Sequence, residues 1–137
     1  MPEDPVPALH AGRSGVSPLT PPPDAPPMAG NLLAGLPAPG AAEAFDTLFR
    51  GAAVRIERIA SHGHASPDDF WYDQPDDEWV MVVHGEALLA FDDGRRHAMR
   101  AGDWIAIPAH CRHRVASTGP DTVWLAVHAA ACGGPAP

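Results

Sequence analysis

Residues 78–85 read EWVMVVHG, a short apolar run that begins with an acid and ends with a glycine. Side chains alternate across a β-strand, so Glu78, Val80 and Val82 share one face. The opposite face carries three more apolar side chains, Trp79, Met81 and Val83. A strand of a small antiparallel barrel commonly leaves one face to solvent, so this second apolar face needs a cover. The candidates are the 29–51 segment, a second sheet or a partner subunit, and we expect a homodimer.

Similar apolar runs follow one another through the rest of the chain. They are separated by turns rich in glycine, proline and aspartate, which favour tight reversals of the backbone. Many short strands with frequent turns predict an all-β fold, either an antiparallel sandwich or a barrel. The runs are AVRIERIA (53–60), EWVMVVH (78–84), EALLAF (86–91), DWIAI (103–107), HRVAS (113–117) and TVWLAVHA (122–129).

The barrel is assigned to residues 52–130, with three flanking segments. Residues 1–28 are rich in proline and show no apolar period, so we expect a disordered tail. The 29–51 segment is expected to contain a short N-terminal helix, because four of its apolar residues have helical spacing: Ala42, Phe45, Leu48 and Phe49. Residues 131–137 are expected to form a flexible C-terminus.

The composition excludes several classes of function. The formal net charge is −8 and the chain contains no lysine. Nucleic-acid binding needs clustered Lys and Arg, so no nucleic-acid partner is expected. The lack of lysine excludes Schiff-base chemistry. The chain also has no glycine-rich phosphate loop, so no nucleotide cofactor is expected. The sequence shows no secretory pattern and no apolar run of about 18 residues, so we expect no membrane partner and a cytoplasmic location.

Two motifs between Val54 and His128 resemble those of the cupin superfamily, and the chain is similar to a small single-domain cupin with a type-2 conserved barrel. In the first motif a glutamate is followed by a glycine after six residues, as Glu78 is followed by Gly85. In the second motif a glycine, a proline and a histidine recur at set intervals, which Gly102, Pro108 and His113 match. The resemblance implies a jelly-roll fold, also called a double-stranded β-helix.

The resemblance also implies a metal site at the mouth of the barrel. Glu78 and His113 match family ligands, but no His-x-His pair stands at the spacing that the first motif requires. With the three-residue spacing Tyr72 and Gln74 occupy those positions, and with the four-residue spacing Trp71 and Asp73 do. An amide or phenol oxygen binds most transition metals less well than imidazole does. A metal would therefore be held by Glu78, His113, Gln74 and Tyr72 less tightly than in a four-ligand cupin, or would need another donor.

Two further histidines offer such a donor. His62 and His64 form a His-x-His of their own, although the loop that separates them from Glu78 has thirteen residues where the family has three or four. Gly63 suits a turn better than a strand interior, so exposed turn histidines are the alternative interpretation. Tyr72, Gln74 and Trp71 are the expected lining of a substrate pocket.

Two functional hypotheses remain open at this point. The first is a metal-dependent cupin enzyme with Fe, Zn, Mn, Ni or Cu that acts on a small oxygenated molecule. The superfamily implies dioxygenase, isomerase, lyase or decarboxylase chemistry, and no catalytic residue is assigned. The second is a metal-free cupin that binds or senses a small molecule without catalysis. The fold hosts both kinds of protein, so only the site can separate them.

Overall fold

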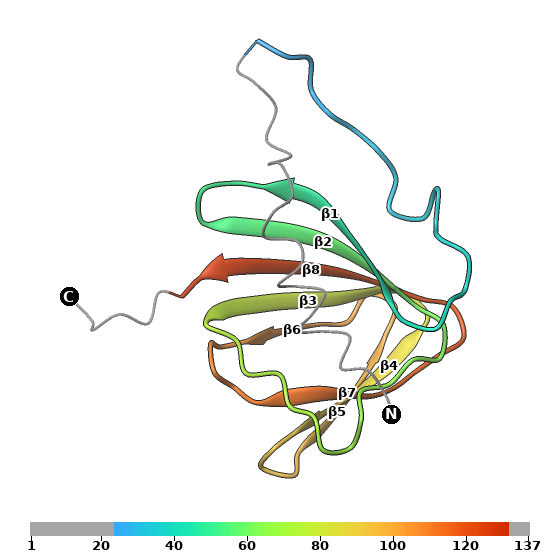
Figure 1. Cartoon of the computed structure of the whole chain (residues 1–137), viewed down its shortest axis with the longest axis vertical. Coiled ribbons are helices and arrows are strands. Elements are labelled where there is room, and N and C mark those ends of the chain that lie inside the picture. Colours follow the sequence, from blue (N-terminus) through green and yellow to red (C-terminus); the bar gives the residue numbers. More distant parts are fainter. Residues whose placement is uncertain (1–23, 132–137) are drawn as a thin grey trace, which may run out of the picture.

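The computed structural model describes residues 24–131, which form two antiparallel β-sheets packed face to face (Figure 1). The larger sheet contains, in spatial order, β1 (Ala44–Arg50), β2 (Val54–Ser61), β8 (Thr122–Ala130), β3 (Asp76–His84) and β6 (Trp104–Ile107). The smaller sheet contains, in spatial order, β5 (Arg96–Arg100), β4 (Glu86–Phe91) and β7 (His113–Thr118). This is the predicted all-β jelly-roll barrel. Residues 1–23 and 132–137, where most of the expected tail and C-terminus fall, lie outside the described residues.

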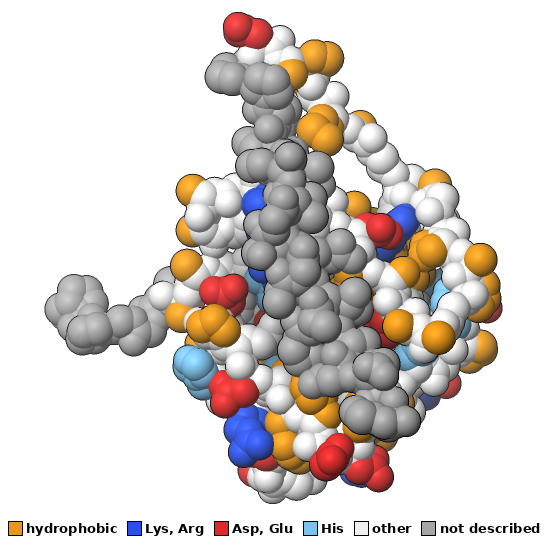
Figure 2. All heavy atoms as spheres, in the orientation of Figure 1, with side chains coloured by type: hydrophobic (Ala, Val, Ile, Leu, Met, Phe, Trp, Pro, Cys, Tyr) orange, Lys and Arg blue, Asp and Glu red, His pale blue; other side chains and the backbone are white. Residues whose placement is uncertain are grey.

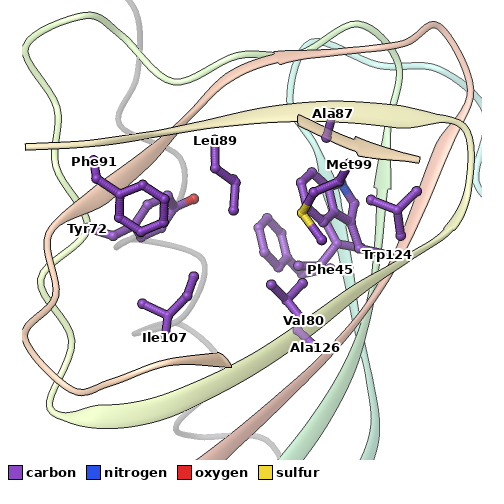
Figure 3. Packing of buried hydrophobic residues seen from close by; sticks show 12 residues of the cluster. Phe45, Tyr72, Val80, Ala87, Leu89, Phe91, Met99, Ile107, Trp124 and Ala126 are labelled. Carbon is purple, nitrogen blue, oxygen red and sulfur yellow. The ribbon is translucent and has the colours of Figure 1, made fainter. Parts of the chain in front are cut away.

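The core lies between the two sheets, as the alternation along β3 predicts. Val80 and Val82 are buried, and Glu78 is 9% exposed on the same face. On β8, next to β3, Ala126 and Trp124 pair with Val80 and Val82 and are buried as well. Figure 3 shows Tyr72, Phe91 and Ile107 gathered at one end of this core, with Phe45 and Trp124 nearer the other. Glu57 is buried as well, so the interior contains carboxyl groups that need hydrogen-bond or charged partners.

The segment expected to form a helix is strand β1, so that prediction is wrong. Phe45 and Leu48 are three residues apart, a spacing that imitates a helical period. β1 pairs with β2, and its register shifts between Thr47 and Phe49. Such a bulge inserts one extra residue and interrupts the alternation by which a strand is recognised. As a result Phe45 is buried in the core, whereas Leu48 is 38% exposed.

Three motif positions in turns of the barrel have positive φ angles, namely Gly85, Gly102 and His110. Gly85 ends β3 with φ 91°, and a Cβ atom there would lie 2.6 Å from the carbonyl oxygen of Asp121. Glycine is therefore required at this motif position. His110 has φ 62° at the second-motif position where cupins carry a glycine. Its Nδ1 lies 2.6 Å from Asp73 Oδ1, a contact that links two loops next to the candidate site.

The outer face of the larger sheet is covered in part by the segment before β1. Arg58 points outward from β2 and donates hydrogen bonds to the carbonyls of Leu32 at 3.2 Å and Ala34 at 2.8 Å. Farther along the same face, Trp79 and Trp104 stack with ring centroids 5.8 Å apart, and Trp104 is 57% exposed. Acidic and basic side chains are interspersed over the face shown in Figure 2. Within residues 24–131, no helix is long and apolar enough to cross a membrane.

Candidate functional site

A cavity lies inside the barrel and is lined by residues of both sheets. Its volume is about 40 Å³, enough for an ion with one or two water molecules. Most of its wall is apolar, formed by Phe45, Ile59, Val80, Leu89, Ile107, Val115 and Trp124. The polar wall consists of Glu43, Tyr72, Gln74, Glu78 and His113. Four of these five polar residues are among the site residues that the sequence predicts.

Glu78 is the acid at the centre of the polar wall. It begins the inward row of β3, and its Oε1 accepts a hydrogen bond from Gln74 Nε2 at 3.0 Å. The same oxygen lies 3.5 Å from His113 Nε2. Burial opposes the charge, but hydrogen bonding to His113, the nearby His128 and the Gln74 amide outweigh it and lower the pKa of Glu78 to about 2. The carboxylate is therefore charged throughout the physiological range.

His113 begins β7 and faces Glu78 with one defined nitrogen. Its Nδ1 lies 2.8 Å from the carbonyl oxygen of Cys111, which can only accept, so Nδ1 carries the proton. Nε2 is then the nitrogen that faces Glu78. Burial lowers the pKa of His113, but hydrogen bonding and charge from Glu78 raise it above its ordinary value overall. A second proton or another cation at Nε2 is thus favoured by the neighbouring carboxylate.

Tyr72 and Gln74 reach the cavity, as the motif spacing predicts. Tyr72 pairs with His113 through backbone hydrogen bonds of 2.7 Å and 3.2 Å, and its ring stacks on the imidazole with centroids 5.2 Å apart. The carbonyl oxygen of Gln74 accepts a hydrogen bond from the His110 amide at 2.8 Å, which fixes its backbone. The segment before β3 therefore places two polar side chains beside Glu78.

The other predicted residues lie elsewhere. Trp71 is outside the cavity lining, and the guanidinium groups of Arg112 and Arg114 lie 5.9 Å and 5.6 Å from its ring. Neither His62 nor His64 lines the cavity. His62 Nδ1 lies 3.2 Å from the Pro120 carbonyl oxygen, and His64 Nε2 lies 2.9 Å from the Gly40 carbonyl oxygen. Both histidines thus fasten loops outside the cavity, as the alternative interpretation has it, but both are half-buried rather than exposed.

A buried polar network behind Glu78 escaped the sequence analysis. His128, on β8, pairs with Glu78 of β3, and its Nε2 lies 4.0 Å from Glu78 Oε2. The same nitrogen lies 3.5 Å from Oε1 of Glu57, whose Oε2 lies 3.1 Å from Arg55 Nε. Glu57 is fully buried and His128 is 2% exposed. The signal was present in AVRIERIA, because alternation puts Arg55 and Glu57 on the same face as buried Ile59.

Glu43 is a second acid of the cavity that the sequence analysis missed. It precedes β1 and hydrogen-bonds to Ser61 Oγ, which also accepts a hydrogen bond from Trp124 Nε1 at 3.0 Å. Burial raises the pKa of Glu43, and the Ser61 hydrogen bond and the charge of His64 oppose that rise only in part. Ser61, the partner of Glu43, pairs with Thr122 at the start of β8, whereas Glu78 pairs with His128 near its end. Glu43 and Glu78 therefore lie toward opposite ends of β8.

The atoms around Glu78 fit a divalent ion that is held by few protein ligands. Two donors bound to one ion at about 2.1 Å lie roughly 3.0–3.4 Å apart, and Glu78 Oε1 and His113 Nε2 are separated by 3.5 Å. The His113 Nδ1 bond to a backbone carbonyl is the outer-shell contact typical of metal-bound histidine. Among residues 24–131, however, no three His, Cys, Asp or Glu side chains converge on one point. A third protein donor would therefore be a neutral oxygen of Gln74 or Tyr72.

Comparison with known proteins identifies relatives of this fold. A crystal structure described as "a putative mannose-6-phosphate isomerase" from Ralstonia eutropha JMP134 is 51% identical, with a TM-score of 0.74; the match covers 77% of this chain and 100% of that one. A cupin superfamily protein from Desulfitobacterium hafniense DCB-2 is 19% identical over 76% of this chain and 93% of its own, with a TM-score of 0.63. A Neisseria meningitidis protein is 18% identical over 74% and 99%, with a TM-score of 0.60.

No curated protein matches the chain. The cupin domain family matches residues 57–128, a span that begins at Glu57 and ends at His128. This span contains the strands that supply Glu78 and His113, and the distant structural matches share its fold. The chain therefore belongs to the cupin family.

Proposed function

We propose that this protein is a small cupin enzyme that uses a divalent metal ion, held by Glu78 and His113, to act on a small oxygenated molecule. The observation that carries the proposal is the 3.5 Å approach of His113 Nε2 to Glu78 Oε1 inside an apolar cavity. If Nε2 of His113 carries no proton, its lone pair and the Glu78 carboxylate repel each other at this distance in a medium of low dielectric constant. A cation between them, either a proton or a metal ion, removes the repulsion.

Isomerase chemistry is the first reaction type to test. The support is the 51% identical structure from Ralstonia eutropha, which is described as a putative mannose-6-phosphate isomerase. A divalent ion at this site would polarise a carbonyl or hydroxyl oxygen of the substrate. The cavity holds far less than the roughly 300 Å³ of a typical ligand pocket, so a sugar-sized substrate would present its reacting end at the mouth of the barrel.

The protein's own residues have separate roles in this proposal. The Cys111 carbonyl fixes the tautomer of His113, and the stacked Tyr72 ring fixes the plane of its imidazole. The Gln74 amide orients the Glu78 carboxylate through its 3.0 Å hydrogen bond. The apolar wall excludes bulk water, which strengthens every electrostatic interaction at the site.

A metal-free binding module is the second candidate, and one observation favours it. Glu78 already accepts a hydrogen bond from Gln74 and lies beside His113, so a protonated imidazole can neutralise the carboxylate without a metal. In that case Tyr72, Gln74 and Glu78 would hold a small polar ligand at the mouth, and no reaction would follow.

Metal-dependent thermal stability separates the two candidates. Chelator-treated protein should gain stability from at least one of Mn, Fe, Zn, Ni or Cu, by about 2.7 kcal/mol when the ion is a hundredfold above its Kd. Glu78→Gln and His113→Gln should remove that gain, whereas the exposed Glu86→Gln and the half-buried His97→Gln should keep it. The loaded protein is then assayed for mannose 6-phosphate isomerisation. A wild type that gains nothing from any of these metals would favour the binding module.

We also propose that the chain forms a homodimer through the outer face of β3 and β6. Trp79 and Met81 are half-buried within one protomer, and Trp104 remains 57% exposed beside them. Two aromatic rings and a methionine on one flat sheet face form the kind of apolar patch that a second copy can cover.

A further inference from the structure

The segment before β1 is fastened to the barrel at two separate points. The first point is the turn over residues 31–35. The Arg58 guanidinium donates hydrogen bonds of 2.8–3.3 Å to three carbonyl oxygens of this turn, those of Leu32, Ala34 and Gly35. The second point is Glu43, which hydrogen-bonds to Ser61 at the end of β2. The residues between these two points form a bridge from the outer face of the larger sheet to the interior of the barrel.

Residues 36–43, which we call the strap, make few polar contacts with the sheets. They have no regular secondary structure, and residues 38–42 are all exposed. Pro37 and Pro39 lack an amide hydrogen, so the strap cannot continue the hydrogen-bond ladder of the sheet. Within residues 24–131, two hydrogen bonds join the strap to the barrel: one from His64 Nε2 to the Gly40 carbonyl at 2.9 Å, and the contact between Glu43 and Ser61. A segment held by so few contacts opens at a lower free-energy cost than a core strand does.

Glu43 is both the end of the strap and a part of the cavity wall. It is the one residue of the described segment before β1 that lines the barrel cavity. Its partner Ser61 is fully buried and accepts a hydrogen bond from Trp124 Nε1 at 3.0 Å. Trp124 lines the same cavity. An outward movement of the strap would therefore remove part of the wall and expose the contact between Ser61 and Trp124 to water.

We propose that the strap is a gate at one end of the barrel cavity and that the contact between Glu43 and Ser61 is its latch. The gate opens when Glu43 withdraws into water, while Arg58 keeps the turn at residues 31–35 in place. Glu78 lies toward the other end of β8, so the gate gives the cavity an opening distinct from the mouth at Glu78 and His113. This inference goes beyond the proposed function and holds with or without a metal ion at Glu78.

The ionisation of Glu43 sets the direction in which the gate responds to pH. The titratable and polar groups around it are Ser61 on β2, His64 after β2 and, across the cavity, Tyr72, Glu78 and His113. Burial raises the pKa of Glu43, and the Ser61 hydrogen bond and the charge of His64 oppose that rise only in part. The open state, in which water solvates the carboxylate, releases this proton more readily than the closed state. Opening is therefore least favoured below about pH 4.5, and it increases as the pH rises through the pKa of Glu43 in the closed state.

Solvent exchange of the Trp124 indole hydrogen, followed by NMR, tests the gate. This hydrogen is held in the bond to Ser61, and its signal is identified by its loss in Trp124→Phe. Glu43→Gln keeps an oxygen that can accept from Ser61 but cannot ionise. The wild type should exchange faster than Glu43→Gln, and the ratio of the two rates should grow from pH 5 to pH 8, by up to about tenfold per pH unit. The intrinsic exchange rate cancels because the two proteins are compared at the same pH.

Two further variants and one internal reference make the result decisive. Glu86→Gln removes an exposed charge and should exchange like the wild type at every pH. Glu43→Ala removes the latch and should exchange fast throughout the range, which also tests the gate if Glu43→Gln does not fold. The Val82 amide, bonded to the Asp103 carbonyl at 3.0 Å in the core, reports global unfolding. Equal rates in wild type and Glu43→Gln at every pH, or an increase that the Val82 amide shares in full, would overturn the proposal. No metal takes part in the measurement, so a failure of the proposed function would leave this result standing.

Discussion

Glu43 contributes a pH-dependent term to the stability of the protein. Burial raises its pKa above the usual 4.5, so the folded state holds this proton more tightly than the unfolded chain does. The contribution of this proton to the free energy of unfolding is fully present below about pH 4.5, and it is lost as the pH rises through the pKa of Glu43 in the folded state. We predict that Glu43→Gln, which cannot ionise, gains stability relative to the wild type as the pH rises from 4 to 8.

Urea unfolding at several pH values measures this difference. Glu86→Gln removes the same charge from an exposed position and controls for the change in net charge. A difference between Glu43→Gln and the wild type that stays constant over the whole pH range would contradict the prediction.

The backbone of His110 is strained. Its φ of 62° lies in the left-handed region, which disfavours residues with a Cβ by about 1 kcal/mol or more. Substitution by Gly or by Ala removes the contact with Asp73 alike, but only glycine relieves the strain. We predict that His110→Gly is more stable than His110→Ala by about 1 kcal/mol. Chemical denaturation measures the gap, and equal stabilities would mean that the loop carries no strain.

At the scale of the elements, the turn between β3 and β4 fixes where the inward row of β3 ends. Gly85 has φ 91° and would place a Cβ atom 2.6 Å from the Asp121 carbonyl oxygen. Gly94 has the same φ but open space around it. We predict that Gly94→Ala lowers the free energy of unfolding by about 1 kcal/mol, because alanine disfavours the positive φ. Gly85→Ala should lower it by at least about 2 kcal/mol, because the backbone must also move to make room for the Cβ atom.

Thermal or urea unfolding of the two alanine variants gives this comparison directly. The difference between them isolates the steric contact, because the change in φ preference is common to both. If Gly85→Ala is no less stable than Gly94→Ala, the close approach of the β8 loop to this turn does not exist in solution.

The strands were largely predictable because alternation is a local property of the sequence. Glu78, Val80 and Val82 share a face in any straight strand, so the inward row of β3 could be read from residue order. β1 could not, because its bulge breaks the alternation and leaves Phe45 and Leu48 at a spacing that also fits a helix.

The site was predictable to the extent that it follows from motif spacing. Tyr72, Gln74, Glu78 and His113 line one cavity, as the spacing implies. Glu57 and His128 were missed because their proximity to Glu78 depends on the pairing of β2, β8 and β3, which are distant in sequence. Their buried positions could be inferred from alternation, but the partner of each could not.

At the scale of the whole molecule, the outer face of β3 predicts how the chain associates. Met81 lies between Trp79 and Val83 and pairs with exposed Trp104 of β6. A charge in this patch would be buried against apolar groups of the partner, at a cost of several kcal/mol. We predict that wild type is dimeric at tens of micromolar and that Met81→Asp is monomeric or aggregates. Light scattering decides this.

Leu88→Asp is the control for the association experiment. Leu88 is a half-buried residue on β4 of the smaller sheet, so its substitution should leave the dimer intact. A monomeric wild type, or equal loss of dimer in both variants, would contradict an interface on the outer face of the larger sheet.

The most direct test of the metal proposal is anomalous diffraction from crystals grown with the ion that stabilises the protein most. The predicted result is one anomalous peak within about 2.0–2.3 Å of both Glu78 Oε1 and His113 Nε2, with a neutral oxygen or water completing the coordination. The peak should be absent from crystals of His113→Gln grown in the same way. An ion bound elsewhere, or a Glu78–His113 pair in direct contact with no peak between them, would contradict the metal-dependent account.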